Sequence, residues 1–338
     1  MFSFCMVKAA HSGSCPDKNM KALIFNTPGG TDVLEYRDVP DPILTPGHLL
    51  VKTEAIGLNY ADLMRRSGVY PLSGEAPYIN GYEGAGTVID ANGQIGFSAG
   101  DRVCFADVPF ANASLVAVPA DHAIPLPAGI SFETAASVML QGLTAQFLTA
   151  DCHQVREGET VLVHAAAGGV GQLLVQVGKL LGAKLICLVS SAEKKEIVQA
   201  LGADAVFTYN ENWVSAVQAH QPEGVDVVYD SVGTTLKDSL AATRVRGQVV
   251  LFGLAGGSLD LGNPLLLIAE SKTITGGDLW NYLTSREERI RRSAELFGWL
   301  GSRQVRPARP HCFQLSEGKA AHDFMESRKS TGKILLIP

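Results

Sequence analysis

The sequence predicts an α/β protein in which a parallel, doubly wound sheet follows a compact β-rich segment. From about Thr144 onward, strand-like and helix-like patterns alternate, which is typical of βαβ units. A glycine cluster at residues 165–171 separates one such strand from the next helix. Before it, residues 20–139 show short strand-like runs broken by Gly and Pro. The length of 338 residues predicts two domains at about 150 residues each.

The β-rich segment begins at Met20, where strand-like sequence starts. The runs that follow lie at residues 49–53, 86–90, 101–105 and 114–118. Residues 1–19 mix Cys, Ser, His and Lys without periodicity and lack the apolar stretch of a secretory signal. We expect them to form a disordered extension.

The alternating half starts with the strand-like residues 160–164. The helix after the glycine cluster has one apolar face, because Val170, Leu173, Leu174, Val177 and Leu181 keep the i, i+3, i+4 spacing. Gly182 is placed to end that helix in a left-handed conformation. Further strand-like runs lie at residues 184–189, 205–208, 225–229 and 248–252, before a charged helix at 284–300 and an apolar strand at 334–337.

Composition excludes several classes of protein. The net charge is −6 and no run of Lys and Arg occurs, which argues against a nucleic-acid partner. No apolar stretch reaches about 18 residues, so no membrane span is expected. The six cysteines form no C-x-x-C pair and are widely spaced, which favours reduced thiols in a cytoplasmic protein.

The glycine cluster matches a dinucleotide-binding fingerprint whose first glycine is replaced by Ala166. Gly168 would let the backbone approach a pyrophosphate, and Gly171 would let the helix pack closely on the sheet. Free N–H groups at the start of the helix would hold the phosphates. A tight structural turn would look similar, but the position between a strand and a helix favours cofactor binding. The predicted pyrophosphate-binding residues are Gly168, Gly169, Val170 and Gly171.

The end of the next strand bears on the choice between NAD and NADP. An NAD enzyme usually carries an Asp or Glu there to bind the ribose hydroxyls. Here the position reads Val189-Ser190-Ser191, and Lys194 follows within a turn. Hydroxyls and a cation favour a 2′-phosphate and therefore NADP, although Glu193 weakens the electrostatic argument. The same residues could instead cap and solvate the next helix.

From Met20 to Pro338 the sequence resembles the medium-chain dehydrogenase/reductase superfamily, and within it the zinc-free, NADPH-dependent quinone oxidoreductases of the zeta-crystallin group. Several motifs in fixed order carry the resemblance. They are Gly57-Leu58-Asn59-Tyr60-Ala61-Asp62, Gly68-Val69-Tyr70-Pro71, Gly81-Tyr82-Glu83, Gly100-Asp101-Arg102-Val103, Gly142-Leu143-Thr144, the alanine-glycine loop, Tyr229-Asp230-Ser231-Val232-Gly233, Glu326-Ser327-Arg328 and Gly332-Lys333-Ile334.

The resemblance implies a two-part catalytic domain. A GroES-like β-rich domain would comprise residues 20–139 and 277–338, and a Rossmann NADPH-binding domain would be inserted at 140–276. The family's active site lies in the cleft between the two domains. The resemblance also implies a homodimer or homotetramer.

The resemblance implies that the enzyme contains no zinc. The three positions that match zinc ligands of related alcohol dehydrogenases are Asn59, Tyr82 and Gln141, none of which is a typical zinc ligand. Glu83 and Asp62 are then structural carboxylates. His164 ends a strand near the expected cofactor and is interpreted as a packed histidine, not as a metal ligand.

The resemblance assigns roles to residues of the cleft. Asn59 would fix the nicotinamide carboxamide or bind a substrate oxygen, and Tyr70 would donate a hydrogen bond to the developing oxyanion; Tyr70 could instead only pack beside Pro71. Tyr82 is a weaker candidate. The remaining predicted cofactor-binding residues are Gln141 and Thr144 near the nicotinamide, Ser190, Lys194, Tyr209 and Arg328 near the adenosine phosphate, and Ser231, Phe252 and Gly253 near the ribose and nicotinamide.

The resulting functional hypothesis is zinc-independent hydride transfer from NADPH to a quinone. Without a metal, an acceptor that delocalises negative charge onto oxygen is the easier target. One alternative is an NADPH-dependent reductase of α,β-unsaturated carbonyls or enoyl thioesters. An alternative of another class is a crystallin-like NADPH-binding protein with little turnover.

Overall fold

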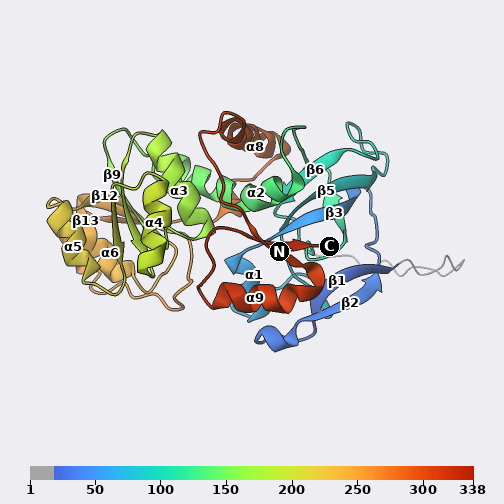
Figure 1. Cartoon of the computed structure of the whole chain (residues 1–338), viewed down its shortest axis with the longest axis horizontal. Helices are drawn as coiled ribbons and strands as arrows, with labels where there is room; N and C mark the ends of the chain where they lie inside the picture. Colours follow the sequence, from blue (N-terminus) through green and yellow to red (C-terminus); the bar gives the residue numbers. More distant parts are fainter. Residues whose placement is uncertain (1–18) are drawn as a thin grey trace, which may run out of the picture.

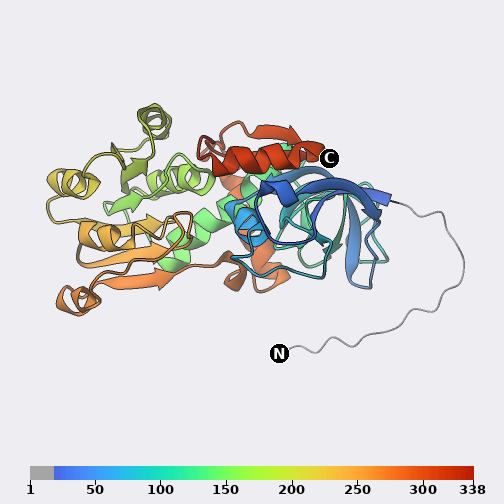
Figure 2. The same cartoon turned by 90° about the horizontal axis from the view of Figure 1, so that it is seen from below.

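The computed structural model describes residues 19–338 and consists of two lobes that lie side by side along the long axis (Figures 1 and 2). One lobe is β-rich, and the other is built on a parallel sheet with helices on both faces. Helix α2 (Phe132–Phe147) lies between them. The prediction for residues 1–19 falls outside the described residues, apart from Asn19, which begins β1 (Asn19–Phe25).

The parallel sheet has six strands in the order β11-β10-β9-β12-β13-β14. In chain order this is 3-2-1-4-5-6, the arrangement of a Rossmann fold, so the predicted fold class is confirmed. The order reverses between β9 and β12, and ligands bind such sheets where the strands end at this point. The strands are β9 (Thr160–Val163), β10 (Lys184–Val189), β11 (Ala205–Thr208), β12 (Val225–Asp230), β13 (Thr243–Leu251) and β14 (Thr273–Gly276).

Alternating side chains of these strands build a core on each face of the sheet. Val161 and Val163 pack on the α3 side, whereas Leu162 faces the cluster that holds Trp213. Helix α3 ends as its sequence predicts, because Gly182 has a φ of +80°. The helices of this lobe are α3 (Gly169–Leu180), α4 (Ala192–Ala200), α5 (Trp213–His220), α6 (Leu236–Ala242) and α7 (Leu265–Ala269).

The β-rich lobe contains two sheets. The smaller has the order β2-β1-β4, with β2 at Glu35–Pro40 and β4 at Tyr78–Ile79. The larger has the order β15-β16-β3-β5-β6-β8, and β7 also pairs with β3. Its strands are β3 (His48–Leu58), β5 (Glu83–Asp90), β6 (Arg102–Ala106), β7 (Leu115–Pro119), β8 (Ile124–Pro125), β15 (His311–Gln314) and β16 (Ile334–Ile337).

The last strand of the chain joins segments from its first third in this larger sheet, because β16 pairs antiparallel with β3. The helices of this lobe are α1 (Tyr60–Arg66), α8 (Arg286–Gly301) and α9 (Gly318–Glu326). The proposed boundary between residues 139 and 140 falls inside α2, and the exact domain boundaries stay a prediction. In the part of the chain that is described, no helix is long and apolar enough to cross a membrane.

Candidate active site

The glycine-rich loop leaves β9 and enters α3 with little free space around it. Ala165 takes a left-handed φ of +47°, and Gly168 is the N-cap of α3. A Cβ on Gly171 would lie 2.5 Å from the carbonyl oxygen of Ala165. Glycine is therefore required there for the helix to approach the strand, as the sequence predicts. The first N–H groups of α3, a helix of 12 residues, suit an anion.

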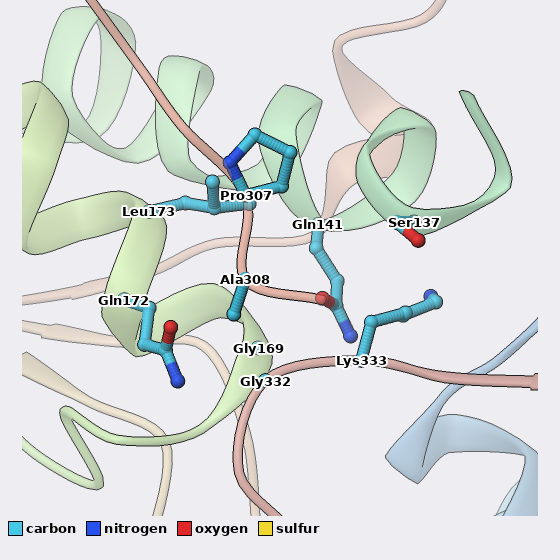
Figure 3. A pocket seen from close by; sticks show the side chains of 9 residues that line it. All are labelled: Ser137, Gln141, Gly169, Gln172, Leu173, Pro307, Ala308, Gly332 and Lys333. Atoms are coloured by element: carbon cyan, nitrogen blue, oxygen red, sulfur yellow. The ribbon is translucent and has the colours of Figure 1, made fainter. Parts of the chain in front are cut away.

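The β-rich lobe contacts the same loop from the other side. Gly332 donates its backbone N–H to the carbonyl of Ala167 at 3.1 Å, and Gly332 forms a bridge with Gly168. A Cβ on Gly169 would lie 2.1 Å from Oε1 of Gln141. Figure 3 shows Gln141 reaching from α2 toward Gly169 and Gly332, beside a small cavity of about 10 Å³. The loop is thus enclosed by both lobes.

A buried polar cluster lies on the β-rich side of the seam, by which we mean the contact between the glycine-rich loop and residues Gln141 and Gly332. Lys333 donates to Oε2 of Glu83 at 2.5 Å and to Oδ1 of Asn59 at 2.8 Å. The Asn59 amide donates to Oε2 of Glu83 at 2.8 Å and to the carbonyl of Gly57 at 3.2 Å. The second carboxylate oxygen of Glu83 accepts from the backbone N–H of Leu140 on α2. All three side chains are buried.

Gln141 completes the set of bonds to Asn59. Its Nε2 donates to Oδ1 of Asn59 at 3.4 Å, so both lone pairs and both protons of the Asn59 amide are used within the protein. A direct contact of Asn59 with a carboxamide or a substrate oxygen requires one of these bonds to be exchanged. The role of Asn59 as a ligand stays a prediction.

Asp62 and its neighbours extend the cluster along α1. Asp62 accepts from the backbone N–H of Asn59 at 2.8 Å and lies 3.8 Å from Arg65. Burial raises the pKa of Asp62 to about 6, although the Arg65 charge opposes this shift. The Arg65 guanidinium lies 3.7 Å from the centre of the Tyr82 ring, and the Tyr82 hydroxyl is 2.9 Å from that of Ser73. Asp62 and Tyr82 therefore have structural partners.

Tyr70 and Thr144 differ in the freedom of their hydroxyl groups. Tyr70 is half-buried in the turn after α1, where its backbone N–H donates to the carbonyl of Met64. Its hydroxyl forms no hydrogen bond with another residue between 19 and 338. Thr144 donates its hydroxyl to the carbonyl of Leu140 at 2.7 Å, which leaves it as an acceptor only. Of these two hydroxyls, the Thr144 proton is already used within the protein, and the catalytic role of Tyr70 stays a prediction.

Two residues predicted to bind the adenosine phosphate, Lys194 and Arg328, are in contact through the Arg328 backbone. Lys194 on α4 donates to the backbone carbonyl of Arg328 at 2.7 Å, and Ser190 is exposed at the end of β10. Burial lowers the pKa of Lys194 from its ordinary value. Arg328 itself has a left-handed φ of +58° and donates to the carbonyl of Ala255 at 3.4 Å. The Lys194 side chain and the Arg328 backbone are thus in contact, and the joint role of Ser190, Lys194 and Arg328 at a phosphate stays a prediction.

The loops after β12 and β13 run side by side. Ala255 donates its N–H to the carbonyl of Ser231 at 3.0 Å, and a Cβ on Gly253 would lie 2.9 Å from that carbonyl. Phe252 and Gly253 are half-buried at the end of β13. Tyr60 from the β-rich lobe donates its hydroxyl to the carbonyl of Ala255 at 3.1 Å. This contact joins the two lobes beside the predicted ribose and nicotinamide residues.

His164 is buried and Tyr209 is half-buried, and both lie next to the glycine-rich loop. The Tyr209 hydroxyl accepts from the backbone N–H of Ala165 at 2.9 Å and is 3.1 Å from Nδ1 of His164. The His164 ring packs edge-on against Trp213. Sequence reasoning interpreted His164 as a packed histidine, and the structure places it so. Its hydrogen bonds were not foreseen.

The three positions that match zinc ligands carry no carboxylate, thiol or imidazole group. Asn59 and Gln141 contact each other, whereas Tyr82 packs on Arg65. Among residues 19–338, no three His, Cys, Asp or Glu side chains are grouped so that they could hold a metal. The zinc-free assignment stays a prediction, which elemental analysis of the purified protein would test.

Lys333 is the main residue that sequence reasoning missed. It was noted only as part of a terminal motif, yet it is 3% exposed and joins Glu83 and Asn59. A lone Lys directly before an apolar strand is a weak signal of such a role. The charged partner lies 250 positions earlier and reaches it only through the pairing of β16, β3 and β5.

Two family models match the chain. Residues 45–157 match the alcohol dehydrogenase GroES-like domain, and residues 169–295 match the zinc-binding dehydrogenase domain. A two-lobed molecule with these domains and a glycine-rich loop between them defines a member of the medium-chain dehydrogenase/reductase superfamily.

Known relatives narrow the assignment. Quinone oxidoreductase from Pseudomonas aeruginosa is 38% identical over 94% of this chain and 99% of its own length. A 2-haloacrylate reductase from a Burkholderia species is 34% identical over 94% of this chain and 98% of its own length. The Escherichia coli quinone oxidoreductase, solved as a complex with NADPH, superposes with a TM-score of 0.90 at 36% identity, covering 94% of this chain and 100% of that one. The chain belongs to the quinone oxidoreductase family.

Proposed function

We propose that this protein is an NADPH-dependent quinone oxidoreductase. The observation that carries the proposal is the glycine-rich loop at the strand-order reversal, enclosed by the β-rich lobe and followed by hydroxyl and cationic groups where an NAD enzyme has a carboxylate. Similarity to quinone oxidoreductases over nearly the whole chain supports it.

The residues present fit NADPH. Because Gly168 and Gly171 have no side chains, the start of α3 presents only backbone and packs closely on β9, as a pyrophosphate site requires. Ser190, Lys194 and Arg328 would hold the 2′-phosphate, since hydrogen bonds to charged groups contribute about 1.5–3 kcal/mol each. These contacts stay part of the proposal.

Bound NADPH supplies a hydride from its nicotinamide ring. The chain's own residues then have to meet the negative charge that develops on the acceptor oxygen. Tyr70 has a hydroxyl proton available for this oxygen, whereas Asn59 is held in one orientation by Glu83 and Lys333 and can donate only if one of its present hydrogen bonds is exchanged. A preorganised donor such as the Tyr70 hydroxyl can stabilise an oxyanion without a metal. The adjoining lobes limit access of water to the seam.

A second candidate is the reduction of α,β-unsaturated carbonyl compounds. The similarity to a 2-haloacrylate reductase favours it, because that relative is matched over nearly its full length. A conjugated acceptor also places the developing charge on an oxygen, so the same donors would serve. This activity is the runner-up to quinone reduction.

Turnover and binding assays test the proposal together. The purified protein is assayed with 1,2- and 1,4-quinones, an enal and an enoyl thioester, and dissociation constants for NADPH and NADH are measured for the wild type and Lys194→Ala. We expect quinone turnover, tighter binding of NADPH than of NADH, and a preference for NADPH that is at least tenfold smaller in Lys194→Ala.

Equal affinities of the wild type for NADPH and NADH would contradict the cofactor assignment. NADPH binding without turnover would instead support the crystallin-like alternative. Stoichiometric zinc whose removal abolishes activity would contradict the metal-free mechanism.

We also propose that the protein is cytoplasmic and forms a homodimer or a homotetramer; the structure offers a surface that supports assembly. β14 is an edge strand of the parallel sheet, and a row of exposed apolar side chains lies close to it in the sequence. Such an edge is a ready surface for pairing with a second copy. The exposed residues are Val245, Leu259, Leu261, Leu265, Leu266 and Ile268.

A further inference from the structure

A chain of hydrogen bonds links the loops that follow β9 and β12, the two strands between which the sheet order reverses. The backbone N–H of Ala165 bonds to the Tyr209 hydroxyl at 2.9 Å, which is 3.1 Å from Nδ1 of His164. Nε2 of His164 is 3.0 Å from the hydroxyl of Ser239, which donates to Oδ2 of Asp230 at 2.7 Å. His164, Ser239 and Asp230 are all buried.

Asp230 fixes the direction of every bond in this chain. Burial opposes its ionisation, but His164 and hydrogen bonds from Gly233, Ser239 and Thr235 outweigh burial and keep the pKa of Asp230 below its ordinary value. As a carboxylate it only accepts, so the single proton of Ser239 points to it. The Ser239 oxygen must then accept from Nε2–H of His164.

The tautomer of His164 determines the direction of the hydrogen bonds that reach the glycine-rich loop. Burial lowers the pKa of His164, while Asp230 and Asp238 act in the opposite sense, and the neutral ring carries one proton. With that proton on Nε2, Nδ1 is an acceptor, and the Tyr209 hydroxyl donates to it. One lone pair of the Tyr209 oxygen receives Ala165 N–H, so this hydroxyl has no proton left to donate elsewhere.

We propose that His164 is a positioning residue for cofactor binding, held as the Nε2–H tautomer, which sets the glycine-rich loop relative to the loop at residues 231–235. Asp230 connects directly to this second loop through the N–H groups of Val232 and Gly233 and the hydroxyl of Thr235. The inference rests on the proposed function, because these two loops are the ones predicted to hold NADPH.

The chain of bonds also revises how Tyr209 acts. Sequence reasoning places Tyr209 at the adenosine 2′-phosphate, but a hydroxyl whose proton is given to His164 cannot donate to a phosphate. Tyr209 then supports binding through Ala165 and the loop, which every dinucleotide contacts. Lys194, in contrast, discriminates between cofactors. Loss of Tyr209 or His164 therefore weakens NADPH and NADH by the same factor.

Substitutions of His164 that keep one bond at a time test the proposal. His164→Asn can keep an acceptor near the Nδ1 position, His164→Gln can keep a donor near the Nε2 position, and His164→Leu keeps neither. His153 provides a matched control, because it also bridges two side chains, Gln248 at 2.8 Å and Glu159 at 3.0 Å, but precedes β9. Dissociation constants for NADPH and NADH and urea unfolding are measured for each variant and for Tyr209→Phe.

We expect His164→Leu and Tyr209→Phe to raise both dissociation constants about tenfold with an unchanged ratio between them. His164→Asn and His164→Gln, which each keep one of the two bonds, should each recover only part of the loss, and His153→Leu should lower stability with NADPH affinity within twofold of wild type. A folded His164→Leu protein with wild-type affinity would overturn the proposal, and so would a selective loss of NADPH affinity in Tyr209→Phe.

A spectroscopic measurement on the wild type does not depend on any variant folding. Imidazole ¹⁵N shifts should show His164 as the neutral Nε2–H tautomer from pH 6 to 8. The Nδ1–H tautomer, or titration in that range, would overturn the assignment. If the wild type binds no NADPH while the tautomer is as expected, the proposed function fails and the bond chain stands.

Discussion

At the residue scale, Asn59 and Tyr70 differ in how their polar groups are hydrogen-bonded, and we therefore expect them to have different roles. Asn59 is held by four hydrogen bonds, so its orientation is set before any ligand arrives, whereas the Tyr70 hydroxyl is unpaired within residues 19–338. This difference separates a group that positions from a group that can donate.

We predict that Tyr70→Phe slows single-turnover hydride transfer about a hundredfold with an enone, since one preorganised donor to an oxyanion contributes about 3 kcal/mol. The loss should be smaller with a quinone, which is already activated. Asn59→Ala should lower the rate and weaken NADPH binding together. If both variants transfer hydride at the wild-type rate to both acceptors at saturation, neither residue stabilises the oxyanion.

Asp62 gives a pH-dependent prediction. Its pKa of about 6 in the folded protein lies above its ordinary value of 3.8, so between these values the folded chain holds a proton that the unfolded chain has lost. Stability from this group therefore falls as pH rises from about 4 to about 6, by up to about 1.4 kcal/mol per unit. Asp62→Asn should lack this slope. Parallel curves of unfolding free energy against pH for both proteins would contradict the raised pKa.

At the element scale, α3 and β9 show what sequence periodicity can predict. The apolar face of α3, its end at Gly182 and the strands β10, β11 and β16 were predicted at or within one residue of their observed bounds, because each is set by local patterns. The helix α2 and the strands β14 and β15 were missed. Nearly all of α2 is buried, so it shows no clear amphipathic period, and β14 and β15 are edge strands of only four residues each, too short to show one.

The contact of α3 with its loop gives a prediction about Gly171. In Gly171→Ala the new Cβ would meet the backbone of Ala165 and Ala166 at 2.5 and 2.7 Å, so the helix must move outward. We expect the free energy of unfolding to fall by about 2 kcal/mol. We also expect NADPH binding to be lost. Gly178→Ala on the same helix is the control, since its Cβ meets only the flexible end of Leu185 at 3.1 Å. Similar NADPH affinities in the two variants would exclude the close-packing role.

At the scale of the whole molecule, the proposed dimer predicts a change in mass. Leu265→Lys combined with Ile268→Lys, at positions 65% and 78% exposed, should convert a dimer into a monomer in light-scattering chromatography. Ile95→Lys is the control, because Ile95 is fully exposed in the other lobe. A wild type that is monomeric at micromolar concentration would refute the dimer.

The site illustrates the limit of prediction at this scale. Phosphate-binding glycines were identifiable because they are adjacent in the sequence. The Glu83–Lys333 pair was not, because it forms only when β16 joins β3. The prediction of a catalytic domain made from both ends of the chain came from resemblance to a family, since periodicity alone does not show which strands pair.

The late arrival of β16 has a consequence for synthesis on the ribosome. β3 and β5 leave the exit tunnel early, yet their neighbour β16 and the counter-ion of Glu83 follow only after residues 91–333 have been made. At about 5–20 residues per second this interval is on the order of 10 to 50 s. During it the nascent β-rich lobe carries an open sheet edge and an unneutralised acid, whereas the parallel sheet has all six strands as soon as residue 276 has been made. The middle of the polypeptide can therefore mature before its beginning does.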